Sequence, residues 1–220
     1  MFEYLSNDHG QSKYYYHGCR NMETLSKILD SKKICTPREL GLKLEKGKAL
    51  FNGLDHVGVC KKFSDSEYCA QDINGRISAF PDYICKNHGL ILSDDIKAKK
   101  TEIYNIRNYS PDFIYKFVSE HADSRWSDMF DEFQVKGSIG IDKFKAVIIP
   151  VDELEFWWNR PCPNDIQFLL NIISKADEYN LDIVNSCDDK FSELYESSDY
   201  NRDEQNNKIK KRVMKIIRQN

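Results

Sequence analysis

The sequence predicts an α+β fold in which many short strands are interleaved with a few helices. Residues 132–136 alternate with period two, and residues 144–149 form an apolar run that ends at Pro150, as two β-strands would. Between Met22 and Leu29, apolar residues recur at helical spacing instead. The chain has no internal repeat, so we expect a single α+β domain with an appendage rather than a repeat protein.

The N-terminal elements follow from local signals. The aromatic run Tyr14–Tyr16 predicts a buried strand that leads into residues 17–20. Asn21 is expected to cap a helix that ends near residues 31–33. Residues 54–63, with Val57 and Val59, predict the next strand.

The rest of the chain gives weaker signals that alternate between strand, turn and helix. Proline punctuates the strand expected at 78–85, and the lysine-rich positions 97–100 form a charge run. The remaining expectations are strands at 89–92, 132–136 and 144–149, a turn at 137–140, and helices at 111–121, 165–176 and from Glu204 onward.

Composition places the chain among ordinary globular proteins. Of its 220 residues, 40% are hydrophobic and 30% charged, which excludes wholesale disorder. No apolar run approaches the roughly 20 residues of a membrane span, and the first residues lack the features of a signal peptide. The seven cysteines are irregularly spaced, which favours a reducing compartment. We therefore expect a soluble, cytoplasmic protein without a membrane partner.

Charge divides the chain unevenly. Residues 202–218 carry seven basic and two acidic side chains, which leaves 25 basic and 33 acidic residues elsewhere. We expect a catalytic core at 1–160 and a helical extension at 161–220 that packs on it and is basic at its end. The basic segment suits either a nucleic-acid contact or an intramolecular salt-bridged helix. Its isoleucines and Val213 recur at helical spacing, which favours the second alternative.

Two separated motifs carry the functional signal. His17 and Gly18 end the tyrosine strand just before the capped helix, and 115 residues after His17 a glutamate, Glu132, opens a strand followed by a turn and an apolar strand. This order, over residues 14–150, resembles the ADP-ribosyltransferase superfamily, in both its poly(ADP-ribose) polymerase-like and its DNA-modifying toxin-like branches. The resemblance implies an ADP-ribosyltransferase-like domain with a split mixed sheet and flanking helices.

The resemblance also implies roles for particular residues. Glu132 would be catalytic, because a carboxylate stabilises the oxocarbenium-like transition state formed when the nicotinamide–ribose bond breaks. His17 would bind a ribose hydroxyl through one ring nitrogen, and Gly18 would let the nicotinamide amide approach the backbone. Cys19 and Arg20 would complete the NAD-binding strand end. NAD is thus expected as a substrate, with no metal, and the enzyme as a mono-ADP-ribosyltransferase of the glycosyltransferase class.

The acceptor is expected to be a macromolecule, with nucleic acid slightly favoured over protein. Phe130 stands where arginine-modifying toxins of the superfamily carry a second glutamate, which disfavours arginine as the acceptor. Arg38 stands where DNA-modifying members place an arginine that assists the acceptor, although a surface salt bridge is the alternative for it. Such a protein would serve as a toxin, effector or defence enzyme, with an antitoxin or activating protein as a further partner.

Several alternatives stay open. The chain could be an inactive member that binds NAD or a partner, a relative of the tRNA 2′-phosphotransferases, or an NAD glycohydrolase. The strand at 55–60 lacks the serine or tyrosine that would stack on nicotinamide, and Phe63 and Tyr68 are unranked substitutes. A weaker pattern, which suits zinc ligands or a Cys60–His88 nucleophile pair, consists of Cys60, Cys69, Cys85 and His88.

Overall fold

The computed structural model describes residues 12–19, 21–41, 54–61, 88–100, 132–157, 163–186 and 191–219. These residues form a mixed α+β fold built on a seven-stranded sheet with the strand order β5-β6-β3-β1-β4-β8-β9. The strands of this sheet are β1 (Tyr15–Cys19), β3 (His56–Cys60), β4 (His88–Leu92), β5 (Ala98–Lys100), β6 (Glu132–Lys136), β8 (Phe144–Ile149) and β9 (Asp182–Asn185).

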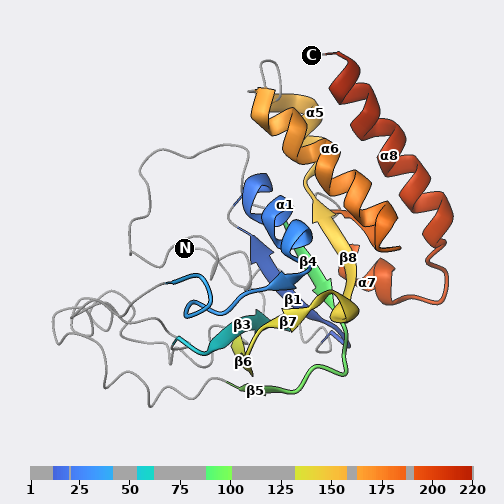
Figure 1. The fold of residues 1–220 in the computed structure, drawn as a ribbon. Coiled ribbons are helices and arrows are strands. Elements are labelled where there is room, and N and C mark those ends of the chain that lie inside the picture. Colours follow the sequence, from blue (N-terminus) through green and yellow to red (C-terminus); the bar gives the residue numbers. More distant parts are fainter. Residues whose placement is uncertain are drawn as a thin grey trace, which may run out of the picture.

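All neighbouring strands of this sheet are antiparallel except β8 and β9, which are parallel. A second ladder of two residues a side joins β2 (Lys33–Ile34) to β7 (Ile139–Gly140). In Figure 1, β1, β4 and β8 run together beneath α1 and α6, whereas β3, β5 and β6 lie below them and are turned away. The sheet is therefore mostly antiparallel, with a change of direction between β1 and β3.

The helices are α1 (Met22–Ser31), α5 (Val151–Trp157), α6 (Pro163–Glu178), α7 (Phe191–Glu196) and α8 (Arg202–Arg218). The side chain of Asn21 caps α1 by accepting from the Thr24 amide at 2.9 Å, as its residue type predicts. The helix ends at Lys32, whose φ of 57° is the left-handed conformation that commonly closes a helix. These two caps fix the two ends of α1 between β1 and β2.

Each face of the sheet carries a hydrophobic cluster. The larger cluster lies under the helices and joins the strands to Leu25 of α1, Leu169 of α6 and Val213 of α8, all fully buried. The smaller cluster, on the other face, is centred on Tyr16 and Ile148, with Tyr195 of α7 packed against it. The alternation of side chains along a strand thus explains why Tyr16 is fully buried among its half-buried tyrosine neighbours.

Most of the regular elements expected from the sequence are confirmed. They are the strands at 15–19, 56–60, 89–92, 132–136 and 144–149, and the helices that begin near 22, 163 and 202. The strand expected at 78–85 and the helix expected at 111–121 lie outside the described residues.

Three expectations need correction. The lysine-rich run at 97–100 is not only a charge run, because Ala98–Lys100 pairs with β6 as an edge strand. The turn expected at 137–140 contains β7, which pairs with β2. The C-terminal extension is not wholly helical, because β9 joins the same sheet beside β8. Among the described residues, no helix is long and apolar enough to cross a membrane.

Candidate functional site

The predicted site residues lie at a seam in the sheet between β1 and β3. Within the described residues, these two strands share a single register pair, Tyr16 with Cys60. The ladders on either side are longer, since β1 pairs with β4 over five positions and β3 pairs with β6 over five. The pairing between β1 and β3 therefore stops at Tyr16 and does not continue to the next residue, His17.

The ring of His17 crosses this seam. Its Nδ1 lies 2.9 Å from the carbonyl oxygen of Gly58 on β3. Because a carbonyl only accepts, Nδ1 carries the proton in this bond, and a neutral ring then has Nε2 as an acceptor. Burial lowers the pKa of His17, and the bond to Gly58 offsets part of that effect. The ring is thus held neutral at pH 7 in one tautomer by the backbone of the neighbouring strand.

Glycines surround this contact on three adjacent strands. Gly18, directly after His17, stands opposite Gly89 of β4. Gly58, which holds the His17 ring, stands opposite Gln134 of β6. Glycine has no Cβ and is the residue type that permits a close approach to the backbone; Gly18 and Gly58 are half-buried, whereas Gly89 is buried. Gly18 itself is half-buried rather than enclosed, which suits the contact predicted for it.

The register also places the backbone of Glu132 two strands from β1, level with Tyr16. Glu132 begins β6 and stands opposite Cys60, and Cys60 stands opposite Tyr16, the neighbour of His17. Adjacent strands are about 4.8 Å apart, so the backbone of Glu132 lies only about 10 Å from β1. His17 and Glu132, which are 115 residues apart in the sequence, are therefore two strands apart in the fold.

The far end of β1 is closed and apolar. Cys19 is 3% exposed and stands opposite His88, which is fully buried. Burial raises the pKa of the Cys19 thiol to about 12, so the thiol stays protonated and is a poor nucleophile. Cys19 consequently serves the packing of the strand end rather than reaching a ligand as predicted. Arg20, the last residue of the predicted NAD-binding set, lies outside the described residues.

His88 is the least satisfied polar side chain near the site. Both ring nitrogens are buried and have no hydrogen-bond partner among the described residues. Burial lowers the pKa of His88 to about 4, so the ring is neutral at pH 7. A buried polar group without partners destabilises a fold, and such groups deserve a physical explanation.

The structure does not bring Cys60 and His88 together. Cys60 stands opposite Tyr16 and His88 opposite Cys19, on the two sides of β1 and three residues apart along it. Three residues of a strand span about 10 Å, too far for a nucleophile pair or a shared zinc ion. Among the described residues, no three His, Cys, Asp or Glu side chains are grouped to hold a metal. Cys69 and Cys85 lie outside those residues.

Arg38 lies in the turn after β2 and is engaged by a carboxylate. Its Nε and a terminal nitrogen donate to the two oxygens of Asp55, at 2.5 and 3.0 Å. The side chains of Arg38 and Asp55 are 63% and 55% exposed, so water screens this pair strongly. The bond from Arg38 lowers the pKa of Asp55, which precedes β3. The salt bridge kept as an alternative for Arg38 is therefore present.

Comparison with models of known protein families, with curated proteins and with solved structures gives no match to this chain. The candidate site therefore stands on its own geometry.

One residue of the candidate site was missed from the sequence. Gly58 sets the tautomer and the orientation of His17, although 41 residues separate them. Its only local signal was a glycine inside an apolar strand, which often marks close approach of another group. Its partner depends on strand pairing, which the local sequence does not specify.

Proposed function

We propose that the chain is an NAD-dependent mono-ADP-ribosyltransferase that moves ADP-ribose from NAD to a macromolecular acceptor, with nucleic acid favoured over protein. The observation that carries this proposal is the seam between β1 and β3. There His17 is fixed through Nδ1 by Gly58, and the strand register brings Glu132 within two strands of it. These are the two residues that the resemblance to ADP-ribosyltransferases singles out.

In this proposal His17 binds the substrate. Its Nδ1 proton is committed to the Gly58 carbonyl, so Nε2 is left to accept a hydrogen bond from a ribose hydroxyl. The neighbouring Gly18 has no Cβ and lets the nicotinamide amide reach the backbone of the strand end. The lowered pKa of His17 keeps this acceptor available at neutral pH. Ring and backbone together orient the nicotinamide riboside half of NAD.

Glu132 acts on the bond that breaks. The bond between C1′ of the ribose and the nicotinamide nitrogen breaks, and nicotinamide leaves with the electron pair. Positive charge then develops on the ribose ring, and a carboxylate stabilises it, as in glycoside hydrolysis. A hydroxyl or amine of the acceptor forms the new bond to C1′ and loses its proton to a general base. The products are ADP-ribosylated acceptor, nicotinamide and one proton.

A second candidate, NAD glycohydrolase activity, is favoured by the contact of Arg38. In the transferase proposal Arg38 assists the acceptor, but two nitrogens of its guanidinium donate to Asp55. If Arg38 stays in this pair, water takes the place of the acceptor at C1′ and free ADP-ribose is released. The pair is exposed, so an acceptor phosphate could exchange with Asp55 at small cost.

One experiment separates these functions. The protein is incubated with NAD labelled in its adenylate part and a cell lysate, and the macromolecular fraction is digested separately with protease, DNase and RNase. The transferase proposal expects a macromolecular label that at least one digestion releases, together with free nicotinamide. Free ADP-ribose without a macromolecular label would indicate glycohydrolase activity. An unchanged NAD pool would indicate an inactive member that only binds NAD or a partner.

A further inference from the structure

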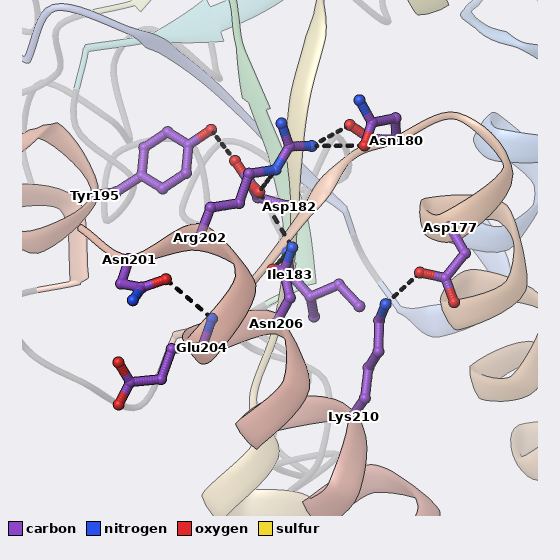
Figure 2. A network of polar contacts seen from close by, with 10 residues as sticks. All are labelled: Asp177, Asn180, Asp182, Ile183, Tyr195, Asn201, Arg202, Glu204, Asn206 and Lys210. Carbon is purple, nitrogen blue, oxygen red and sulfur yellow. Dashed lines mark hydrogen bonds and ion pairs between the residues drawn. The ribbon is translucent and has the colours of Figure 1, made fainter.

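The seven basic residues of α8 divide into two sets. Three of them face the body of the protein and bind its carboxylates (Figure 2 shows two of these contacts). Arg202 pairs with Asp182 of β9, and Lys210 pairs with Asp177 of α6. These contacts explain why a strongly basic helix packs on an acidic body.

Arg212 is the third residue of this inward set, and its partners are two carboxylates of α5. Its Nε donates to one oxygen of Glu155 at 2.9 Å, and a terminal nitrogen binds Asp152 and the other oxygen of Glu155. The bonds from Arg212 lower the pKa of Glu155. Burial alone would raise the pKa of Asp152, but the bonds from Arg212 and Asn185 outweigh it and lower that pKa. Each inward basic residue is thus paired with a carboxylate of β9, α6 or α5.

The other four basic residues form an exposed row, which we call the basic stripe: Lys208, Lys211, Lys215 and Arg218. They recur three, four and three residues apart, which puts them on one face of a helix of 3.6 residues per turn. All four side chains are exposed, and among the described residues none of these side chains makes a hydrogen bond or an ion pair within 4 Å. The stripe extends about 15 Å along the helix axis.

The helix that carries the stripe is fixed in place. Its opposite face buries Ile209, Val213 and Ile216 in the large hydrophobic cluster. Asn201 caps its first turn by accepting from the Glu204 amide at 3.2 Å. Figure 1 shows α8 as the outermost helix beside α6. The stripe is therefore presented on a rigid support, and the apolar face of α8 is not available for insertion into a lipid surface.

The surroundings of the stripe are defined as well. Glu204 lies on the same face, four residues before Lys208, and marks the N-terminal limit of the positive charge. Asp152 and Glu155 lie near Lys208 and Lys215, respectively, but both are bonded to Arg212. These two carboxylates are thus already paired, and the four cations of the stripe face solvent.

We propose that the basic stripe binds the phosphate backbone of a nucleic acid. Four cations in a row of about 15 Å match roughly four nucleotide steps at 3.4 Å each. A protein partner fits less well, because lysine is depleted at protein interfaces and their centres are apolar. Among the described residues, the exposed large hydrophobic side chains are Leu40 and Leu194, and neither lies on α8. The stripe offers charge without an apolar anchor.

This inference rests on the proposed function in one respect, namely that it names the nucleic acid as the acceptor that is modified. The phosphate-binding surface itself does not require catalysis. An assay without NAD therefore tests the stripe alone, and nicotinamide release tests the chemistry alone. Failure of one leaves the other result standing.

The test uses the full chain and a fluorescein-labelled 12-base-pair DNA duplex, with binding followed by anisotropy from 50 to 200 mM NaCl. Four phosphate contacts give a slope of log K against log salt of about −3.6, or about a 150-fold loss of affinity over this range. Replacing all four stripe residues by glutamine should abolish that dependence, and each single replacement should reduce the slope by about 0.9. Glutamine is a good helix former, so circular dichroism should stay unchanged.

The control carries glutamine at four exposed lysines elsewhere, Lys27, Lys97, Lys136 and Lys145. It has the same net charge as the stripe variant and should retain the wild-type slope. Equal losses in both variants would overturn the proposal, because total charge and not the stripe would then determine binding. Binding of poly-glutamate or of vesicles with 30% phosphatidylserine at the oligonucleotide's strength, with the same sensitivity to the stripe, would also overturn it.

Discussion

The seam between β1 and β3 and the outer edge of the sheet at β9 differ in how many protein hydrogen bonds their polar side chains make. At the outer edge, the buried Asp182 pairs with Arg202 and accepts from Tyr195 Oη at 3.0 Å and Asn206 Nδ2 at 3.2 Å (Figure 2). Asn206 in turn accepts from the amide of Ile183 at 2.8 Å. Each carboxylate oxygen there has a protein donor.

At the seam the ladder between β1 and β3 has one register pair, and the polar side chains nearby make few hydrogen bonds. Among the described residues, His17 has one side-chain bond, to Gly58, and His88 has none. Nearly all buried polar groups in proteins have a hydrogen-bond partner, so a group without one needs a physical explanation. At the outer edge both oxygens of the buried carboxylate are bonded, whereas at the seam the half-buried ring of His17 makes one bond and is the group that the proposed function gives to a ligand. His88 is fully buried on the other side of β1, opposite Cys19, and therefore bears on stability instead. Substitutions at the two places test that division.

The largest effect on stability is expected at the outer edge. Asp182→Ala removes a carboxylate that is 7% exposed and leaves Tyr195 Oη and Asn206 Nδ2 without their acceptor, which should cost about 2–4 kcal/mol of unfolding free energy. Urea denaturation measures it. Asp177→Ala is the control, because the Asp177 side chain is 54% exposed and the loss of its pair with Lys210 should cost at most about 1 kcal/mol. Equal losses in the two variants would contradict a special role for the Asp182 network.

The next effect concerns acid stability and His88. The pKa of His88 is about 4 in the folded protein, against the ordinary histidine value of 6.5 for the unfolded chain, so the unfolded state binds the proton first as the pH falls. Stability from this group is present above pH 6.5 and is lost as the pH falls through 4, by about 3 kcal/mol at pH 4. Urea midpoints measured between pH 7 and pH 4 follow the loss.

His88→Leu sharpens this prediction. The substitution removes both the titration and an unpartnered buried polar ring, so stability at pH 7 should be equal or higher. The decline between pH 6.5 and 4 should become shallower than in the wild type. A variant that loses stability at pH 7 by several kcal/mol would show instead that the His88 nitrogens have partners in solution.

The smallest of the three effects concerns ligand affinity at the seam. His17→Ala should weaken NAD binding by about 0.5–1.5 kcal/mol, the usual net value of a hydrogen bond between neutral groups. Calorimetry measures the affinity, and His56→Ala on the same strand as Gly58 is the control. Wild-type affinity should fall in acid with an apparent pKa below 6.5, because protonation of Nε2 removes the acceptor. Unchanged affinity in His17→Ala would make His17 a structural histidine only.

The sequence predicted elements whose signals are local. Asn21 as a cap, the apolar face of α1, the alternation of β6 and the apolar run of β8 are all present in the fold. Strands that depend on distant partners were missed. β2 and β7 have two residues each and exist only through their mutual pairing, and β9 is a short strand held between β8 and α8.

The same division applies to the candidate site. His17, Gly18 and Glu132 were predicted from their order along the chain, and their roles stay predictions; the strand register places the backbone of Glu132 two strands from β1. The seam, the bond from His17 to Gly58 and the burial of His88 arise from nonlocal pairing and could not be read from spacing. For the basic segment, the sequence offered two alternatives, and the structure divides the residues between an inward paired set and an outward exposed one.

The central claim is that the seam is the site where NAD is cleaved. The most direct measurement is nicotinamide release from NAD by the wild type, by Glu132→Gln and by Asp199→Asn, an isosteric control at an exposed carboxylate of the segment before α8. Loss of one transition-state electrostatic group should lower turnover by about 10²–10³ in Glu132→Gln, with NAD affinity nearly unchanged, because the contact is made mainly in the transition state. The control should match the wild type. Wild-type protein that releases no nicotinamide, or a Glu132→Gln variant that releases it at the wild-type rate, would contradict the account.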